Sequence, residues 1–207
     1  MTIPPLSRVT LDPASVPGID ASPYATVVES DVPVVVDRTV SWDRTGYGSH
    51  AETSIAGPST TWFLAEGSTG GSFDLFYLLQ NPGNTDASVT IRYLRPAPQV
   101  PLTKVYTVGA NRRVTIVVDN EVINGQSLAA TDVSAAITST VPIVVERAMY
   151  MSTPGEPYGA GHESAGVTAP ALGWFLAEGA TGAFFDMKDR SRGRAHAGSR
   201  PASCARP

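Results

Sequence analysis

The sequence predicts an all-β protein made of antiparallel sandwich repeats, and three observations lead to this fold class. First, 19 glycines and 17 prolines among 207 residues favour short strands joined by turns over long helices. Second, apolar residues make up 42% of the chain and charged residues 16%, a composition typical of a folded core. Third, the chain repeats itself with a period of roughly 110 residues, the size of one immunoglobulin-like β-sandwich.

The repeat is carried by two blocks of sequence. The hexapeptide Trp62–Gly67 recurs as Trp174–Gly179, and ten of the fourteen positions from Thr61 to Asp74 are identical at an offset of 112 residues. Upstream of it, Val32–Arg38 matches Val141–Arg147 at an offset of 109 residues. The offsets differ because loops accept insertions at little free-energy cost.

These blocks divide the chain into one complete and two partial copies of an immunoglobulin-like β-sandwich. The expected domains are the C-terminal part of one repeat (1–45), a linker (46–61), a complete repeat (62–151), a second linker (152–173), the start of a further repeat (174–187) and a tail (188–207).

Seven strands are expected in the complete copy. Phe73–Leu79 is a continuous apolar run between turn residues, which indicates a buried strand. Ser88–Leu94 and Arg113–Asp119 alternate apolar and polar side chains, as strands with one buried face do. Asn124-Gly125 marks a turn, and Ser127–Asp132 favours a helix but is too short to be stable alone. The other expected strands are Trp62–Ala65, Thr103–Val108, Val133–Thr138 and Ile143–Met149, the last preceded by Pro142.

Charge is distributed unevenly along the chain. Residues 188–207 contain six bases against one acid, and residues 1–187 contain nine bases against eighteen acids. The acidic body lacks the basic face of a nucleic-acid-binding protein, so no nucleic-acid partner is expected. After Met187 the sequence changes abruptly to Arg, Ala, Ser, Gly and Pro, which indicates either a basic, disordered tail or a shifted reading frame. No stretch approaches the ~18–20 apolar residues that span a bilayer, so no membrane insertion is expected.

The succession of Trp62–Gly67, Phe73-Asp74, Asn81-Pro82-Gly83, Val89–Tyr93 and Val141–Arg147 resembles a family of bacterial repeat modules. These modules are tandem, immunoglobulin-like units of long secreted or cell-wall-associated proteins, and many are described only as domains of unknown function. The resemblance covers roughly residues 5–187. It implies an extracellular or cell-wall location and neighbouring repeat modules as partners. It brings no catalytic residues.

Carboxylates and aromatic rings are the candidate ligand-binding groups. Each copy has two carboxylates eight residues apart across a Gly-rich turn, which could bind a ligand or simply stabilise that turn. Each copy also has a tryptophan, which could stack on a sugar ring or anchor an interface. The candidate ligand-binding residues are therefore Trp62, Glu66 and Asp74 in one copy and Trp174, Glu178 and Asp186 in the next, with Trp42, Tyr47 and Tyr158 as further aromatic candidates.

Enzymatic and metal chemistry lack a residue pattern in this sequence. His50 and His162 each have only one carboxylate close in sequence, too few ligands for zinc, and Cys204 has no partner cysteine. We expect no catalytic site, no metal site and no cofactor. Arg38 and Arg147 each follow an acidic residue within a strand, and a structural ion pair at the module boundary is the expected role of each.

The sequence thus predicts a non-enzymatic structural or adhesive repeat module of a large bacterial surface or secreted protein. The alternative is a carbohydrate-binding accessory module that uses exposed aromatic side chains, with cell-wall or extracellular polysaccharide as its partner. Residues 1–5 show no signal-peptide pattern, so this chain is expected to be a fragment of a longer protein.

Overall fold

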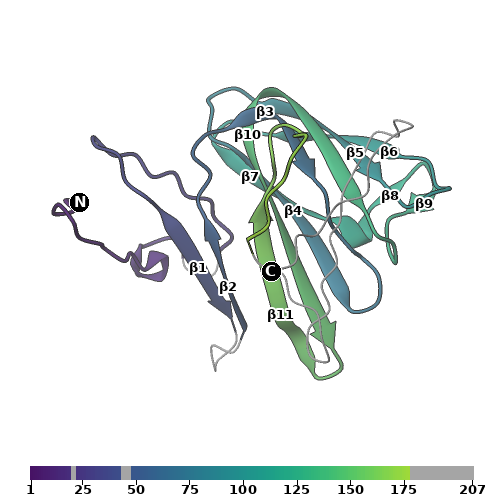
Figure 1. The fold of residues 1–207 in the computed structure, drawn as a ribbon, viewed down its shortest axis with the longest axis horizontal. Coiled ribbons are helices and arrows are strands. Elements are labelled where there is room, and N and C mark those ends of the chain that lie inside the picture. The colour runs from purple at the N-terminus through teal and green to yellow at the C-terminus, as the bar shows by residue number, and fades with distance from the viewer. Residues whose placement is uncertain (20–21, 43–47, 178–207) are drawn as a thin grey trace. The chain divides into compact units, whose positions relative to one another are not determined.

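The computed structural model describes residues 1–19, 22–42 and 48–177 (Figure 1). The chain divides into two units, Met1–Val34 and Val35–Pro207. The first unit contains a 3-10 turn, η1 (Pro13–Ser15), and none of its described residues lies in a strand. Asp12 caps that turn by accepting a hydrogen bond from the amide of Ala14.

The second unit contains all of the described strands. Every pairing between them is antiparallel, which confirms the all-β, antiparallel prediction. No helix in the described ranges is long and apolar enough to cross a membrane. The strands are β1 (Asp37–Trp42), β2 (Gly48–Thr53), β3 (Ser59–Leu64), β4 (Phe73–Asn81), β5 (Ala87–Leu94), β6 (Leu102–Val108), β7 (Arg112–Val117), β8 (Val122–Ile123), β9 (Gln126–Ser127), β10 (Ser134–Thr153) and β11 (Glu156–Ala165).

Strand β10, 20 residues long, organises the large sheet because it pairs along both of its sides. Its first half lies between β5 and β3, and its second half lies between β4 and β11. Strand β6 continues the sheet beyond β5, and β7 continues it beyond β4. The sheet order is therefore β6-β5-β10-β4-β7, and the sheet curls into a half-barrel (Figure 1).

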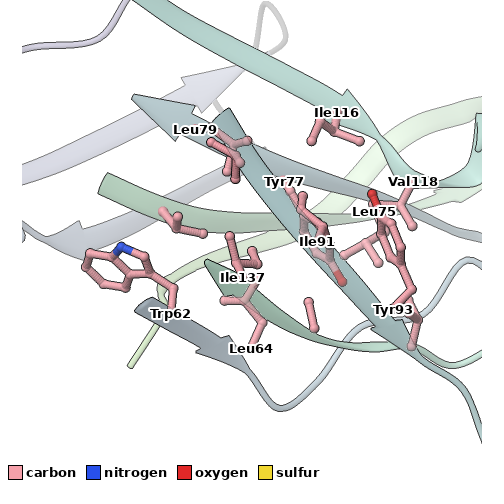
Figure 2. Close-up of a cluster of buried hydrophobic side chains, with 14 of the residues drawn as sticks. Trp62, Leu64, Leu75, Tyr77, Leu79, Ile91, Tyr93, Ile116, Val118 and Ile137 are labelled. Atoms are coloured by element: carbon pink, nitrogen blue, oxygen red, sulfur yellow. The ribbon is translucent and has the colours of Figure 1, made fainter. Parts of the chain in front are cut away.

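The hydrophobic core lies on the inner face of this curled sheet (Figure 2). Side chains alternate between buried and more exposed along β4 and β5, as expected of strands with one face toward a core. The rings of Tyr77 and Tyr93 stack inside it with centroids 6.0 Å apart. Its largest fully buried members include Trp62, Leu75, Tyr77, Leu79, Ile91, Tyr93, Leu128, Ile137 and Ile143.

Each strand predicted from the sequence is present, but the last two are the two halves of β10. Pro142 was expected to begin a separate strand, because proline has no amide to donate to a ladder. Instead, the pairings on both sides of β10 omit residues 140–142, where the strand passes from one half of the sheet to the other. The missing amide of Pro142 therefore breaks no pairing, and β10 continues through it.

The structure differs from the sequence prediction in three local regions. The segments expected to be linkers contain β2 and β11, which complete antiparallel hairpins with β1 and with the second half of β10. The predicted strand Arg113–Asp119 ends in a 3-10 turn, η2 (Val118–Asn120), and Ser127–Asp132 forms no helix. The division of the chain into repeats stays a prediction.

Asn81 fixes the turn between β4 and β5 from a fully buried position. Its side-chain amide donates to the carbonyls of Thr85 (2.8 Å) and Val108 (3.1 Å). Its side-chain oxygen accepts from the amide of Gly83 at 3.0 Å. One side chain thus satisfies three backbone groups that the turn would otherwise leave unpaired.

We predict that Asn81→Ala lowers the free energy of unfolding by about 2–4 kcal/mol, because buried backbone groups lose their partners. Urea denaturation measures this change. Asn84→Ala is the matched control: Asn84 is exposed in the same turn, and its removal should change stability by no more than about 0.5 kcal/mol. Equal effects of the two substitutions would contradict the anchoring role of Asn81.

Candidate functional site at the hairpin junction

The structure contains two hairpins that are copies of one another in sequence and register. In the first hairpin Val40 of β1 pairs with His50 of β2, and in the second Met149 of β10 pairs with His162 of β11. The first member of each pair is related by the repeat offset of 109 and the second by the offset of 112. The internal repeat is therefore also a repeat of strand pairing.

The two hairpins contact each other through a cluster that we call the junction. It combines charged and aromatic side chains from both hairpins. Its members are Arg38, Trp42 and His50 of the β1–β2 hairpin and Glu146, Tyr150, Tyr158 and Glu163 of the β10–β11 hairpin.

Arg38 supplies the positive charge of the junction. Its guanidinium lies 3.2 Å from Glu146 Oε2 and 2.7 Å from Glu163 Oε1. The side chain of Glu163 is only 5% exposed, whereas that of Arg38 is 41% exposed. This confirms an ion pair for Arg38, and the pair joins two hairpins that lie more than 100 residues apart in sequence. A buried pair of this kind fixes orientation more than it adds stability.

Trp42 supplies the main apolar contact of the junction. Its indole nitrogen donates to the carbonyl of Tyr158 at 2.6 Å, and its ring meets that of Tyr150 edge to face, with centroids 5.2 Å apart. His50 Nε2 lies 3.3 Å from the hydroxyl of Tyr150. A Cβ at Gly161 would stand 2.5 Å from the Tyr150 ring and 3.2 Å from that of Trp42. Glycine is required there so that the rings can lie against the strand.

Tyr158 holds the acceptor carbonyl in an unusual backbone conformation, with a φ of 55°. Non-glycine residues rarely adopt this left-handed region, and such outliers concentrate at sites where the surrounding contacts impose them. The amide of Tyr158 donates to Ser152 Oγ at 3.1 Å, and that hydroxyl donates to Asp74 Oδ2 at 2.9 Å. A polar chain from β4 therefore positions the carbonyl that Trp42 contacts.

The electrostatics of the junction favour neutral acids and bases in its interior. Burial, partly offset by Arg38, raises the pKa of Glu163 to about 7, and hydrogen bonding with Glu146 acts in the same direction as burial. Burial and the charge of Arg38 lower the pKa of His50. Because His50 stays neutral near pH 7, its 3.6 Å approach to Glu163 is not a strong ion pair.

Arg147, the repeat counterpart of Arg38, is anchored within the sheet instead of between hairpins. Its guanidinium donates to the carbonyl of Glu66 at 2.6 Å and to Ser164 Oγ at 2.9 Å, and it lies 3.5 Å from the Glu66 carboxylate. Burial lowers the pKa of Arg147, although Glu66 acts in the opposite direction. An ion pair is therefore confirmed for Arg147 as well, with Glu66 as its partner.

The predicted ligand-binding residues of the first copy each have structural partners. Trp62 is 2% exposed, and its indole nitrogen donates to the carbonyls of Ser59 and Ile143, both at 3.0 Å. Its ring has no face free for stacking on a sugar. Glu66 contacts Arg147, and Asp74 accepts from Ser152. These contacts do not assemble the three residues around one shared partner.

In the second copy, Trp174 is 60% exposed. Glu178, Asp186 and the tail lie outside the described residues, as does Tyr47. Among the described residues, no group of three His, Cys, Asp or Glu side chains could hold a metal ion.

Sequence reasoning identified Arg38, Trp42 and Tyr158 but not the junction that they form with Tyr150, Glu146 and Glu163. One signal was available: His50 and His162 occupy equivalent positions of the repeat. Aligning the two histidines would have aligned the hairpins, and the strand character of residues 48–53 and 156–165 would have followed.

We predict that Glu163→Gln gains stability relative to the native protein as the pH rises from about 4.5 to about 7. The folded state holds the Glu163 proton more tightly than the unfolded chain does. Ionisation between the two pKa values therefore lowers the free energy of unfolding of the native protein, but not that of the variant. The relative gain should be on the order of 1–3 kcal/mol.

Urea denaturation across this pH range measures the difference between the two proteins. Glu156→Gln, the same change at an exposed position of β11, is the matched control. A constant difference between the Glu163→Gln variant and the native protein across the range would contradict the assigned environment of Glu163.

Comparison with known proteins identifies no family for this chain. No family model and no curated protein matches it. Two solved structures resemble it. One is the Thermotoga maritima protein 1070, with a TM-score of 0.48 at 14% identity, over 54% of this chain and 96% of the other. The second is the Anabaena sensory rhodopsin transducer, with a TM-score of 0.38 at 28% identity, over 45% of this chain and 99% of the other.

Proposed function

We propose that this chain is a non-enzymatic structural or adhesive part of a bacterial surface or secreted protein, built from immunoglobulin-like β-sandwich repeats. The observation that carries the proposal is the junction, where one copy of the repeated hairpin packs against the next copy. The surface or secreted location rests on the resemblance of the repeat motifs to bacterial tandem modules.

The chemistry of the junction suits a permanent contact between successive modules. In tandem-repeat proteins each unit contacts its neighbours, and those interfaces set the stiffness of the array. Here Arg38 must keep two acidic partners and Trp42 must keep its carbonyl acceptor, so the relative rotation of the two hairpins is restricted. Restricted rotation is the property that a stalk requires.

The alternative function, carbohydrate binding, is favoured by one observation. Trp174 and Phe175 are 60% and 98% exposed, and planar rings in such positions can stack on sugars. The equivalent Trp62 is fully engaged in the core, however, so the same motif serves packing in the complete copy. We therefore favour the structural role.

We predict that the amides of β2 are protected from hydrogen exchange in the intact chain and lose protection in the Trp42→Ala variant. Removal of the indole deletes its hydrogen bond to Tyr158 and its ring contact with Tyr150, and both hold the β1–β2 hairpin in place. Loss of these contacts lowers the local opening free energy of the hairpin. Hydrogen exchange read by mass spectrometry measures it.

Thr39→Ala is the control, because Thr39 is an exposed residue of the same strand and alternation places it on the face opposite Trp42. That variant should keep native protection in β2. If β2 exchanged freely in the native chain as well, the junction would not hold the hairpins together and the stalk proposal would fail.

We also predict that the chain is not retained on insoluble cell-wall or plant polysaccharides. A pull-down with the native chain and its Trp174→Ala variant tests this. Retention by the native chain that disappears in the variant would support the carbohydrate-binding alternative instead. A cooperative thermal transition for both proteins is the control for folding.

A further inference from the structure

One motif of this chain occurs in two different environments. In the complete copy the Trp-Phe-Leu sequence lies in β3, where Trp62 is 2% and Leu64 is 3% exposed. In the later copy the same three residues, at positions 174–176, belong to no strand, and Leu176 is 70% exposed. The later copy has the sequence of a core strand without the neighbour that buries it.

A complementary deficiency lies near the other end of the chain. Extending the repeat offset of 109 places Val28 at the position of Ile137 and Val34 at that of Ile143. Both isoleucines are fully buried in β10, beside β3. Val28 and Val34 are 52% and 42% exposed, and they belong to no strand. Residues 26–34 therefore have the sequence of the strand that β3 pairs with.

We propose that residues 174–176 of one copy of this chain add, as an antiparallel strand, to residues 26–28 of a second copy. The register is that of β3 on β10, where Trp62 pairs with Ile137 and Phe63 with Ala136. By the repeat offsets, Trp174 then pairs with Val28 and Phe175 pairs with Val27. Strand addition of this kind uses backbone hydrogen bonds for affinity and alternate side chains for specificity.

The side-chain contacts of the complete copy indicate what the added strand gains. Trp62 donates from its indole nitrogen to the carbonyl of Ile143 at 3.0 Å. Trp174 would donate in the same way to the carbonyl of Val34, and its ring would leave water. Four exposed side chains, those of Trp174, Leu176, Val28 and Val34, would become buried together. Burial of this apolar surface is the driving force.

A second copy is the occupant that the observations select. The two unpaired segments match the two paired segments of the complete copy, so each carries the side chains that the other needs. The contact is head-to-tail, because it joins different segments of the two molecules. Such a contact leaves one segment of each kind unused in every dimer and therefore continues into linear assemblies. The inference rests on the proposed function only in treating the copies of the repeat as equivalent.

Site-directed cross-linking tests the register. In β3, the amide and the carbonyl of Phe63 both pair with Val167, away from β10. Phe63 and Ala136 thus form a non-hydrogen-bonded pair, the type whose Cα atoms approach closely enough for a disulfide. The equivalent pair in the proposed contact is Phe175 with Val27.

The experiment mixes a Val27→Cys chain with a Phe175→Cys chain, each also carrying Cys204→Ser, in the presence of oxidised glutathione. The expected result is a covalent dimer that contains one chain of each kind. Glu29→Cys replaces Val27→Cys in the control, because it lies two residues out of register on the same strand face. Loss of the covalent dimer in the control is expected. Thermal transitions show that each variant is folded.

Two results would overturn the inference. One is an equal yield of covalent dimer with the Val27→Cys and Glu29→Cys chains, which would show random collision instead of a defined register. The other is a chain carrying both Val27→Cys and Phe175→Cys that closes on itself as a monomer at every dilution. Hydrogen exchange at β2 is measured on the same proteins. Protected β2 amides without cross-linking would reject strand addition alone, and unprotected amides would reject the stalk.

Discussion

Strand β10 is the constraint on which the rest of this structure depends. Four strands, β3, β4, β5 and β11, take their register from it, and β6 and β7 follow as second neighbours. One strand can serve both halves of the sheet because its pairings stop at residues 140–142, where Pro142 needs no amide partner. The same strand contributes Glu146, Arg147 and Tyr150, so the junction and the core share one support.

Much of the fold could be predicted from the sequence because strand signals are local. Alternation identified β5, a continuous apolar run identified β4, and Asn124-Gly125 identified the turn between β8 and β9, where both residues have positive φ. Strands β2 and β11 were not predicted because they are polar and rich in small residues. Their pairing with β1 and β10 stabilises them, and a window of sequence does not contain that information.

The candidate site was less predictable because burial and partners are tertiary properties. Trp62 was equally compatible with a ligand surface and with a core until the carbonyl of Ile143 placed it in the core. The ion pair of Arg38 could be expected from its sequence context, but its partners Glu146 and Glu163 come from elements more than 100 residues away. Tyr150 attracted no attention because a tyrosine in an apolar strand has the pattern of an ordinary core residue.

The two equivalent hairpins differ in length only beyond the pairs that they share. The second hairpin has three more residues between its matched positions, and it uses them for a register shift after Met151 and a further pair, Thr153 with Glu156. The paired positions nearer the core keep their register. Insertions and deletions at the hairpin tip can therefore accumulate over evolution without disturbing the shared pairs, and copies of unequal length can still be exchanged by recombination.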